Sequence, residues 1–208
     1  MTQAKRPPKV HRAPTREAYF DFLVRCYFGQ GTDRLRLCVH RAYLDLNRTL
    51  HGIAKHPSAN DLREKGYLCV ISSLRNLALK ANASSSKTFN TWHKRACLQL
   101  KKTYAKGGFD RFTVGQAQKW LNMSLKYAFA LGESRVPGYI VFYPYAHVPI
   151  DNIVLENLAS QNGPGLSVPW SRLDNYDEYW NVQTQIRALF PGSAPLAWEF
   201  QMWLEGEI

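Results

Sequence analysis

The spacing of apolar side chains is the feature that most constrains this chain. Apolar residues recur at steps of three and four along most of the sequence, and segments rich in glycine, proline or serine interrupt the pattern. Such spacing gives each segment one apolar face, which amphipathic helices bury against one another. We therefore expect an all-α fold, a compact multi-helix domain over residues 16–208. The expected helices span residues 16–28, 34–55, 58–78, 87–106, 114–131, 150–158, 174–190 and 195–203.

One segment departs from this helical spacing. Residues 138–143 read Gly-Tyr-Ile-Val-Phe-Tyr, which is rich in β-branched and aromatic side chains. The segment is expected to be a strand or an extended buried loop, and so to add at most a small irregular strand region. Ser58, Thr113 and Asp174 are the expected N-caps of their helices, and Gln116 follows Thr113 at the spacing of a capping box.

Charge is divided unevenly along the chain. Residues 1–126 hold 24 of the 27 Lys and Arg and 7 of the 16 Asp and Glu, whereas residues 127–208 hold 3 and 9. The chain thus has a basic part (16–126) and an acidic, aromatic part (127–208), preceded by a flexible basic arm over residues 1–15. A basic surface of this size attracts polyanions and gains affinity by counterion release. We expect DNA as the partner, with RNA an alternative and solubility alone a simpler reason for the charge.

Two rows of basic residues fit that partner. Each row repeats every seven residues, so its members lie along one side of a helix. Contacts to phosphate are expected from Arg34, Arg41 and Arg48 in the first row and from Lys87, Lys94 and Lys101 in the second.

Several functional classes are not expected. The chain has no apolar stretch of about 18 residues and no apolar centre in its first 16 residues, so we expect a cytoplasmic protein with no membrane partner. Neither a Walker-type phosphate loop nor a G-x-G-x-x-G motif is present, and no cofactor is expected. Cys38, His40, His51 and His56 fit no common zinc spacing, so no metal site is expected either.

Two segments carry the chemistry that we consider most informative. Gly115-Gln116-Ala117-Gln118-Lys119 opens the helix expected at 114–131, and small residues before a helix expose amides that can bind phosphate. Val148-Pro149-Ile150-Asp151 precedes the next helix, whose N-terminal amides stabilise a carboxylate.

This pair of segments resembles the helix-hairpin-helix DNA glycosylases, whose motif is approximately G-x-G-x-K-x-A followed by a V-D-T-H-like element. The resemblance covers about residues 109–155. It implies a helix-hairpin-helix-like element with Gly115 and Ala117 at the glycine positions. It also implies that Lys119 is the lysine that bifunctional members use as a nucleophile and that Asp151 is the catalytic aspartate.

Other residues follow from the same reading. Gln116, Gln118 and Lys126 are candidates for phosphate contacts, and Tyr143, Tyr145 and Trp170 are candidates for stacking an extruded base. Simpler roles are open for each: Lys119 and Lys126 on a solvated helix face, Asp151 as an N-cap only, and the aromatic residues as core anchors.

The function expected from these observations is base excision from DNA. In this interpretation the enzyme flips a damaged or modified base and hydrolyses its N-glycosidic bond, with lyase activity if Lys119 attacks C1′. The main alternative is a non-catalytic DNA- or RNA-binding protein. A nuclease using Asp151 and Glu156 is third, because no lysine follows Lys126 to complete a common nuclease motif.

Overall fold

The computed structural model describes residues 13–205, so most of the expected basic arm, residues 1–12, lies outside the described residues, as do residues 206–208. Over residues 13–205 the chain forms α-helices and short 3-10 helices and contains no strand. This confirms the all-α class. The α-helices are α1 (Arg16–Phe28), α2 (Arg34–Leu46), α3 (Ala59–Ala78), α4 (Ser86–Lys106), α5 (Val114–Leu131), α6 (Asn152–Ser160), α7 (Tyr176–Leu189) and α8 (Pro195–Glu205). The 3-10 helices are η1 (Asn47–Thr49), η2 (Ile53–Lys55), η3 (Ala81–Ala83), η4 (Ile140–Tyr145) and η5 (Trp170–Arg172).

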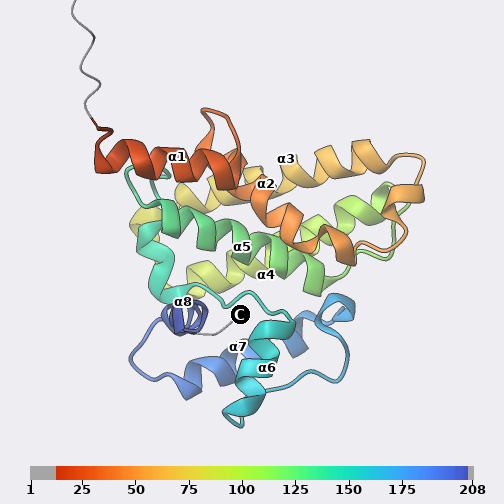
Figure 1. Ribbon diagram of the computed structural model, residues 1–208. Coiled ribbons are helices and arrows are strands. Elements are labelled where there is room, and N and C mark those ends of the chain that lie inside the picture. Colours follow the sequence, from red (N-terminus) through yellow and green to blue (C-terminus); the bar gives the residue numbers. More distant parts are fainter. Residues whose placement is uncertain (1–12, 206–208) are drawn as a thin grey trace, which may run out of the picture.

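Helix α5 forms the centre of the molecule. It packs against α2 and α4 and, toward the lower helices in Figure 1, against η5 and α7. Of its 18 residues, 16 are buried, so it is a core helix with no solvated face. A helix covered on all sides must find partners for its polar side chains within the protein.

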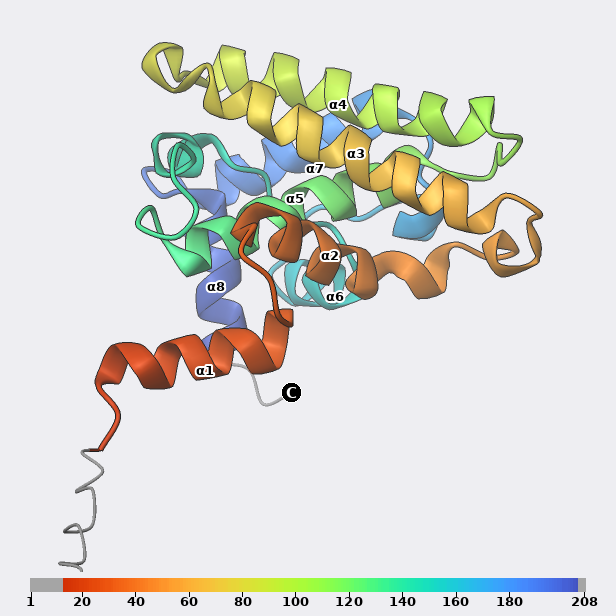
Figure 2. The same ribbon diagram turned by 90° about the horizontal axis from the view of Figure 1, so that it is seen from above.

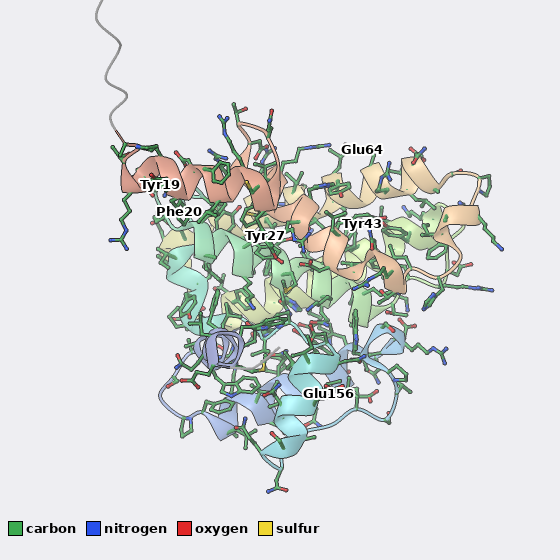
Figure 3. All side chains as sticks on the ribbon, viewed as in Figure 1. Tyr19, Phe20, Tyr27, Tyr43, Glu64 and Glu156 are labelled. Carbon is green, nitrogen blue, oxygen red and sulfur yellow. The ribbon has the colours of Figure 1, made fainter. Side chains whose placement is uncertain are left out.

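The remaining helices surround α5 in two groups. α2, α3 and α4 surround it in the upper part of Figure 1, whereas α6, α7 and α8 form the lower group. α3 and α4 lie side by side at one edge of the molecule, and α1 lies at the opposite edge (Figure 2). α1 buries little besides Val24 and Phe28, and Tyr19 and Phe20, labelled in Figure 3, stay exposed, although the Arg135 guanidinium lies over the Phe20 ring.

The N-caps agree only in part with the sequence prediction. Thr113 and Gln116 form the expected capping box on α5, with both reciprocal hydrogen bonds present. Ser58 precedes α3 but makes no capping bond through its side chain. Asn175, and not Asp174, caps α7 by accepting a hydrogen bond from the amide of Asp177. Asp174 is instead directed toward α4 and α5.

The predicted helix over residues 34–55 is shorter than expected. α2 ends at Leu46, and η1 and η2 follow it separately. Gly52 between them has a φ of 90°, a left-handed conformation that breaks the helical path. The predicted row Arg34/Arg41/Arg48 is therefore not a continuous helical stripe, because Arg48 lies in η1.

The segment at residues 138–143, for which at most a small irregular strand region was expected, forms no strand. Residues 140–145 form the 3-10 helix η4, and residues 13–205 offer no strand with which residues 138–143 could pair. The apolar content of the segment serves packing instead: the Phe142 ring is fully buried and lies 6.3 Å from the Phe89 ring. Glu133 accepts hydrogen bonds from the amides of Gly138 and Ile140, which fixes the turn that leads into η4.

Candidate functional site

The N-terminus of α5 is closed by the protein itself. The amide of Gly115 donates to the carbonyl of Leu173 at 2.7 Å, and the amide of Val114 lies 3.4 Å from a carboxylate oxygen of Asp174. A side chain at position 115 would overlap the carbonyl oxygen of Trp170. Gly115 thus allows η5 to pack on the helix, and in this conformation the predicted turn of Gly115, Gln116 and Ala117 offers no open cradle to a phosphate.

The two glutamines at this end also have internal partners. Gln116 donates from its side-chain amide to the carbonyl of Thr49 at 2.7 Å, besides its role in the capping box. Gln118 is fully buried and exchanges two hydrogen bonds with the backbone of Ile150, at 2.9 and 3.2 Å. Both side chains connect α5 to distant segments and do not face solvent.

The two predicted catalytic residues meet. Nζ of Lys119 lies 2.5 Å from Oδ2 of Asp151, and their side chains are 6% and 16% exposed. Oδ1 of Asp151 accepts a hydrogen bond from the amide of Val154 at 2.9 Å and so caps α6. Asp151 is therefore both an N-cap and the partner of a buried ammonium group.

A second buried ion pair lies two helical turns further along α5. Nζ of Lys126 is 2.6 Å from Oε1 of Glu199 on α8, and the side chains are 10% and 2% exposed. The indole of Trp203 donates to the same carboxylate oxygen at 2.9 Å. The Lys126 ammonium also lies 5.0 Å from the ring centroid of Phe200 and 5.3 Å from that of Trp203. Lys126 is thus enclosed and does not face solvent, where DNA could meet it.

We call Lys119, Asp151, Lys126 and Glu199 the charge cluster. Burial lowers the pKa of Lys126 and raises the pKa of Glu199, and in each case the partner's charge opposes the shift. The charge of Lys119 lowers both pKa values to a lesser extent, and that of Asp151 raises the pKa of Lys126. Buried ion pairs add little net stability compared with apolar packing, and perturbed ionisable groups concentrate at functional sites.

One oxygen of the charge cluster has no partner. Oε2 of Glu199 is buried and accepts no hydrogen bond from any described residue. Because Oε1 already accepts from both Lys126 and Trp203, the second oxygen is the acceptor left for another donor. The charge cluster is therefore the strongest candidate site in the described part of the chain.

A buried polar network adjoins the charge cluster, and the sequence patterns did not reveal it. Nδ2 of Asn122 on α5 donates to the Tyr179 hydroxyl at 2.9 Å, and that hydroxyl lies 2.9 Å from Nδ1 of His147. Nε2 of His147 in turn contacts Oδ1 of Asn90 at 2.9 Å. The network joins α4, α5 and α7 through side chains that are far apart in sequence.

The predicted base-stacking residues do not share one pocket. Trp170 is buried against the N-terminus of α5, whereas Tyr143 packs edge-on against Phe129 near its C-terminus. These ends are about 20 Å apart, at 1.5 Å per residue. Tyr145 is half-buried, and its backbone carbonyl accepts a hydrogen bond from Arg187. Burial raises the pKa of Tyr143, and the charge of Glu199 adds to the shift.

The predicted basic rows are only partly free. Arg34 is half-buried, and Arg41 pairs with Asp45 at 3.0 Å while its guanidinium lies over the Tyr27 ring. Lys94 pairs with Asp177 at 2.8 Å, and Lys101 pairs with Asp174 at 2.6 Å. Arg48 and Lys87 are exposed.

The carboxylates of the predicted nuclease do not converge. Glu156 projects from α6 into solvent (Figure 3), and five positions after Asp151 it lies on another side of that helix. Residues 13–205 contain no group of three or more His, Cys, Asp or Glu side chains placed to hold a metal ion.

Comparisons with protein-family models, with curated proteins and with solved structures found no match to this chain. No helix within residues 13–205 is both long and apolar enough to cross a lipid bilayer.

Proposed function

We propose that this protein binds DNA and hydrolyses the N-glycosidic bond of an extruded base at the charge cluster. The observation that carries the proposal is the contact of Lys119 with Asp151. The glycosylase resemblance selects these two residues from separate segments, and the fold places their charged groups 2.5 Å apart.

In the proposed reaction Asp151 is the catalytic residue. Its negative charge stabilises the positive charge that develops at C1′ as the bond to the base breaks. A water oxygen forms the new bond to C1′ and its proton passes to Asp151, while the base leaves with the bonding electrons and takes a proton from solvent. Asp151 keeps 16% of its side chain exposed, and its neighbours Asn152 and Ile153 are exposed, which gives substrate a path to the carboxylate.

Lys119 has a positioning role in this proposal. An ammonium group that donates to a carboxylate has no lone pair with which to attack C1′. The close pairing with Asp151 therefore favours simple hydrolysis over the Schiff-base route that the resemblance also allows.

The test is single-turnover excision on duplexes that each carry one damaged or modified base. EDTA is present throughout, and alkali afterwards cleaves the strand at abasic sites. The test variant is Lys119→Met with Asp151→Asn, which removes both charges and leaves no unpaired buried ion. Its matched control is Asp61→Asn with Lys65→Met, which removes an exposed ion pair on α3.

We expect the wild type to release at least one base, the charge-cluster variant to be slower by 100-fold or more, and the control to equal the wild type. The proposal is wrong if the wild type leaves every duplex intact. It is equally wrong if the folded charge-cluster variant excises at the wild-type rate.

A non-catalytic DNA- or RNA-binding protein is the second candidate. The observation that favours it is that the groups of the charge cluster are largely buried and already paired, as in a structural ion-pair network. In that case the charge-cluster variant binds nucleic acid as tightly as the wild type, and neither protein produces abasic sites.

A further inference from the structure

The outer face of α4 carries two adjoining hollows. One lies between α3 and α4 and has a volume of about 1040 Å³, and the other lies between α4 and α7 and has a volume of about 640 Å³. Thr91, Arg95 and Gln99 of α4 line both of them. The two hollows therefore form one surface along α4, which we call the α4 groove.

The α4 groove is basic. Lys80, Lys87 and Arg95 line its α3 side, and no acidic side chain lines that side. On the α7 side, Lys94, Arg95 and Lys102 face a single carboxylate, that of Asp177, which Lys94 already neutralises.

Of the predicted row Lys87/Lys94/Lys101, two members are paired and Lys87 alone stays free within residues 13–205. Two further free cations on α4, Arg95 and Lys102, were not selected by that row. Lys87, Arg95 and Lys102 are exposed and form no ion pair with any residue in the described range. They stand on α4 at spacings of eight and seven residues, and so follow one side of the helix for about 22 Å. A row of unpaired cations of this length matches the backbone of a polyanion.

The α7 side of the groove adds an aromatic surface. Trp180 is partly exposed there, beside the exposed Leu98 and the buried Tyr176. An indole ring next to free cations is the combination by which proteins bind single-stranded nucleic acid, with bases stacked on rings and phosphates on Lys or Arg.

We propose that the α4 groove binds single-stranded DNA, with the backbone along Lys87, Arg95 and Lys102 and one base against Trp180. A duplex fits this surface poorly for two reasons. α3 and α4 pack directly on each other, and axes of packed helices are only about 8–10 Å apart, which is narrower than a double helix. A paired base also cannot reach Trp180 without leaving its stack. This binding site goes beyond the proposed base excision and does not depend on it.

The test measures fluorescence anisotropy of a labelled 20-nucleotide strand of mixed sequence, the duplex of that strand, and the RNA of the same sequence. Titrations are made from 50 to 200 mM salt. The test variant is Arg95→Ala with Lys102→Ala. The matched control, Arg16→Ala with Arg25→Ala, removes the same charge from exposed positions of α1 at the opposite edge of the molecule (Figure 2).

We expect the wild type to bind single-stranded DNA at least tenfold more tightly than the duplex. Because each phosphate contact contributes about 0.7 to the slope of log affinity against log salt for single strands, the test variant should lower that slope by about 1.4. Its affinity at 50 mM salt should fall at least tenfold, and the control should lose less than threefold. Trp180→Leu should weaken binding by about tenfold through lost stacking while leaving the salt slope unchanged.

Three results would overturn the inference: equal affinity for strand and duplex, the same loss in the α4 and α1 variants, or tenfold tighter binding of RNA. The outcome is separable from that of the proposed function. Abasic-site formation tests the charge cluster alone, whereas the strand in this assay contains no modified base.

Discussion

At the scale of single residues, Asp151 combines two roles that the sequence could not separate. As an N-cap alone it could be replaced by Asn at little cost, since Asn caps nearly as well as Asp. The structure adds the buried ammonium of Lys119, which Asp151→Asn would leave without its counter-charge. Removing one partner of a buried ion pair costs about 3–5 kcal/mol.

We therefore predict that Asp151→Asn lowers the free energy of unfolding by several kcal/mol, and that adding Lys119→Met restores much of the loss. Urea denaturation of the wild type, both single variants and the double variant measures this coupling as a double-mutant cycle. An Asp151→Asn protein within about 0.5 kcal/mol of the wild type would show that the contact contributes no more than ordinary capping.

Gly115 is a second residue whose role depends on a packing contact from a distant segment. The sequence interpretation assigns it to phosphate binding, whereas the structure places it against the Trp170 carbonyl, where a Cβ has no room. Relief of the overlap requires η5 to move, because the obstructing atom belongs to the backbone. We predict that Gly115→Ala lowers the free energy of unfolding by about 1–3 kcal/mol or more.

Gly165 provides the matched control, since no atom lies within 4 Å of a Cβ added there. Gly165→Ala should leave stability within about 0.5 kcal/mol of the wild type. If the two variants melt at the same temperature, the close approach of η5 to α5 does not hold in solution.

At the scale of elements, α4 carries two kinds of basic residue. Lys94 and Lys101 lie in ion pairs with Asp177 and Asp174 around the start of α7, whereas Arg95 and Lys102 are unpaired within the described range. A lysine that must leave a carboxylate to meet a phosphate contributes less to binding than a free cation does. We predict that Lys94→Ala with Lys101→Ala lowers the salt slope of DNA binding by less than Arg95→Ala with Lys102→Ala does.

The ion pairs of Lys94 and Lys101 contribute little to the stability of the folded protein. Lys94 and Asp177 are 49% and 79% exposed, and ion pairs in water contribute only about 0–1 kcal/mol each. The Lys94/Lys101 variant should thus remain folded in thermal denaturation and serve as a fair comparison. A larger drop in salt slope for this variant than for the variant Arg95→Ala with Lys102→Ala would contradict our assignment of Lys87, Arg95 and Lys102 as the phosphate-binding cations.

Helices were predictable from sequence where local signals agreed. Apolar spacing together with Gly29 and with Gly107 located the ends of α1 and α4, and the capping box located the start of α5. At residues 138–143 the β-branched and aromatic composition left a small strand open, but none forms, because such a segment becomes a strand only beside a partner strand. The local sequence does not show whether such a partner strand exists elsewhere in the chain.

The candidate site was predictable only in part, for a related reason. The glycosylase resemblance selected Lys119 and Asp151, which meet, and amphipathic spacing suggested that Lys126 faces solvent. Lys126 is buried because Glu199, 73 residues later, neutralises it. A single helix reveals the charges it carries but not the distant carboxylates that allow those charges to be buried.

At the scale of the whole molecule, the basic and acidic parts of the chain meet across a buried histidine pair. The rings of His93 on α4 and His147 before α6 have centroids 4.6 Å apart, and both side chains are almost fully buried. His93 contacts the Tyr176 hydroxyl at 2.8 Å, and His147 contacts that of Tyr179. Burial lowers the pKa of His93 to about 3. Burial also lowers the pKa of His147 well below its ordinary value, and the charge of the neighbouring His93 lowers it further.

These shifts make global stability depend on pH with a definite sign. In the unfolded chain both histidines titrate near pH 6.5, so below that pH the unfolded state binds protons at these histidines that the folded state does not bind. Stability contributed by the neutral pair is complete above about pH 6.5. It is lost as pH falls, by roughly 1.4 kcal/mol per pH unit for each histidine, until the folded pKa is reached.

We predict that the free energy of unfolding falls more steeply between pH 6 and pH 4.5 in the wild type than in a His93→Gln/His147→Gln variant. The difference in slope should approach twice the single-histidine value, about 2.7 kcal/mol per pH unit. Carboxylates titrate in both proteins and cancel in the comparison, so the difference isolates the two imidazoles. Urea titrations at four pH values measure both slopes. Parallel slopes would mean that the histidines are hydrated in solution and that the two parts of the chain do not close over them as the structure indicates.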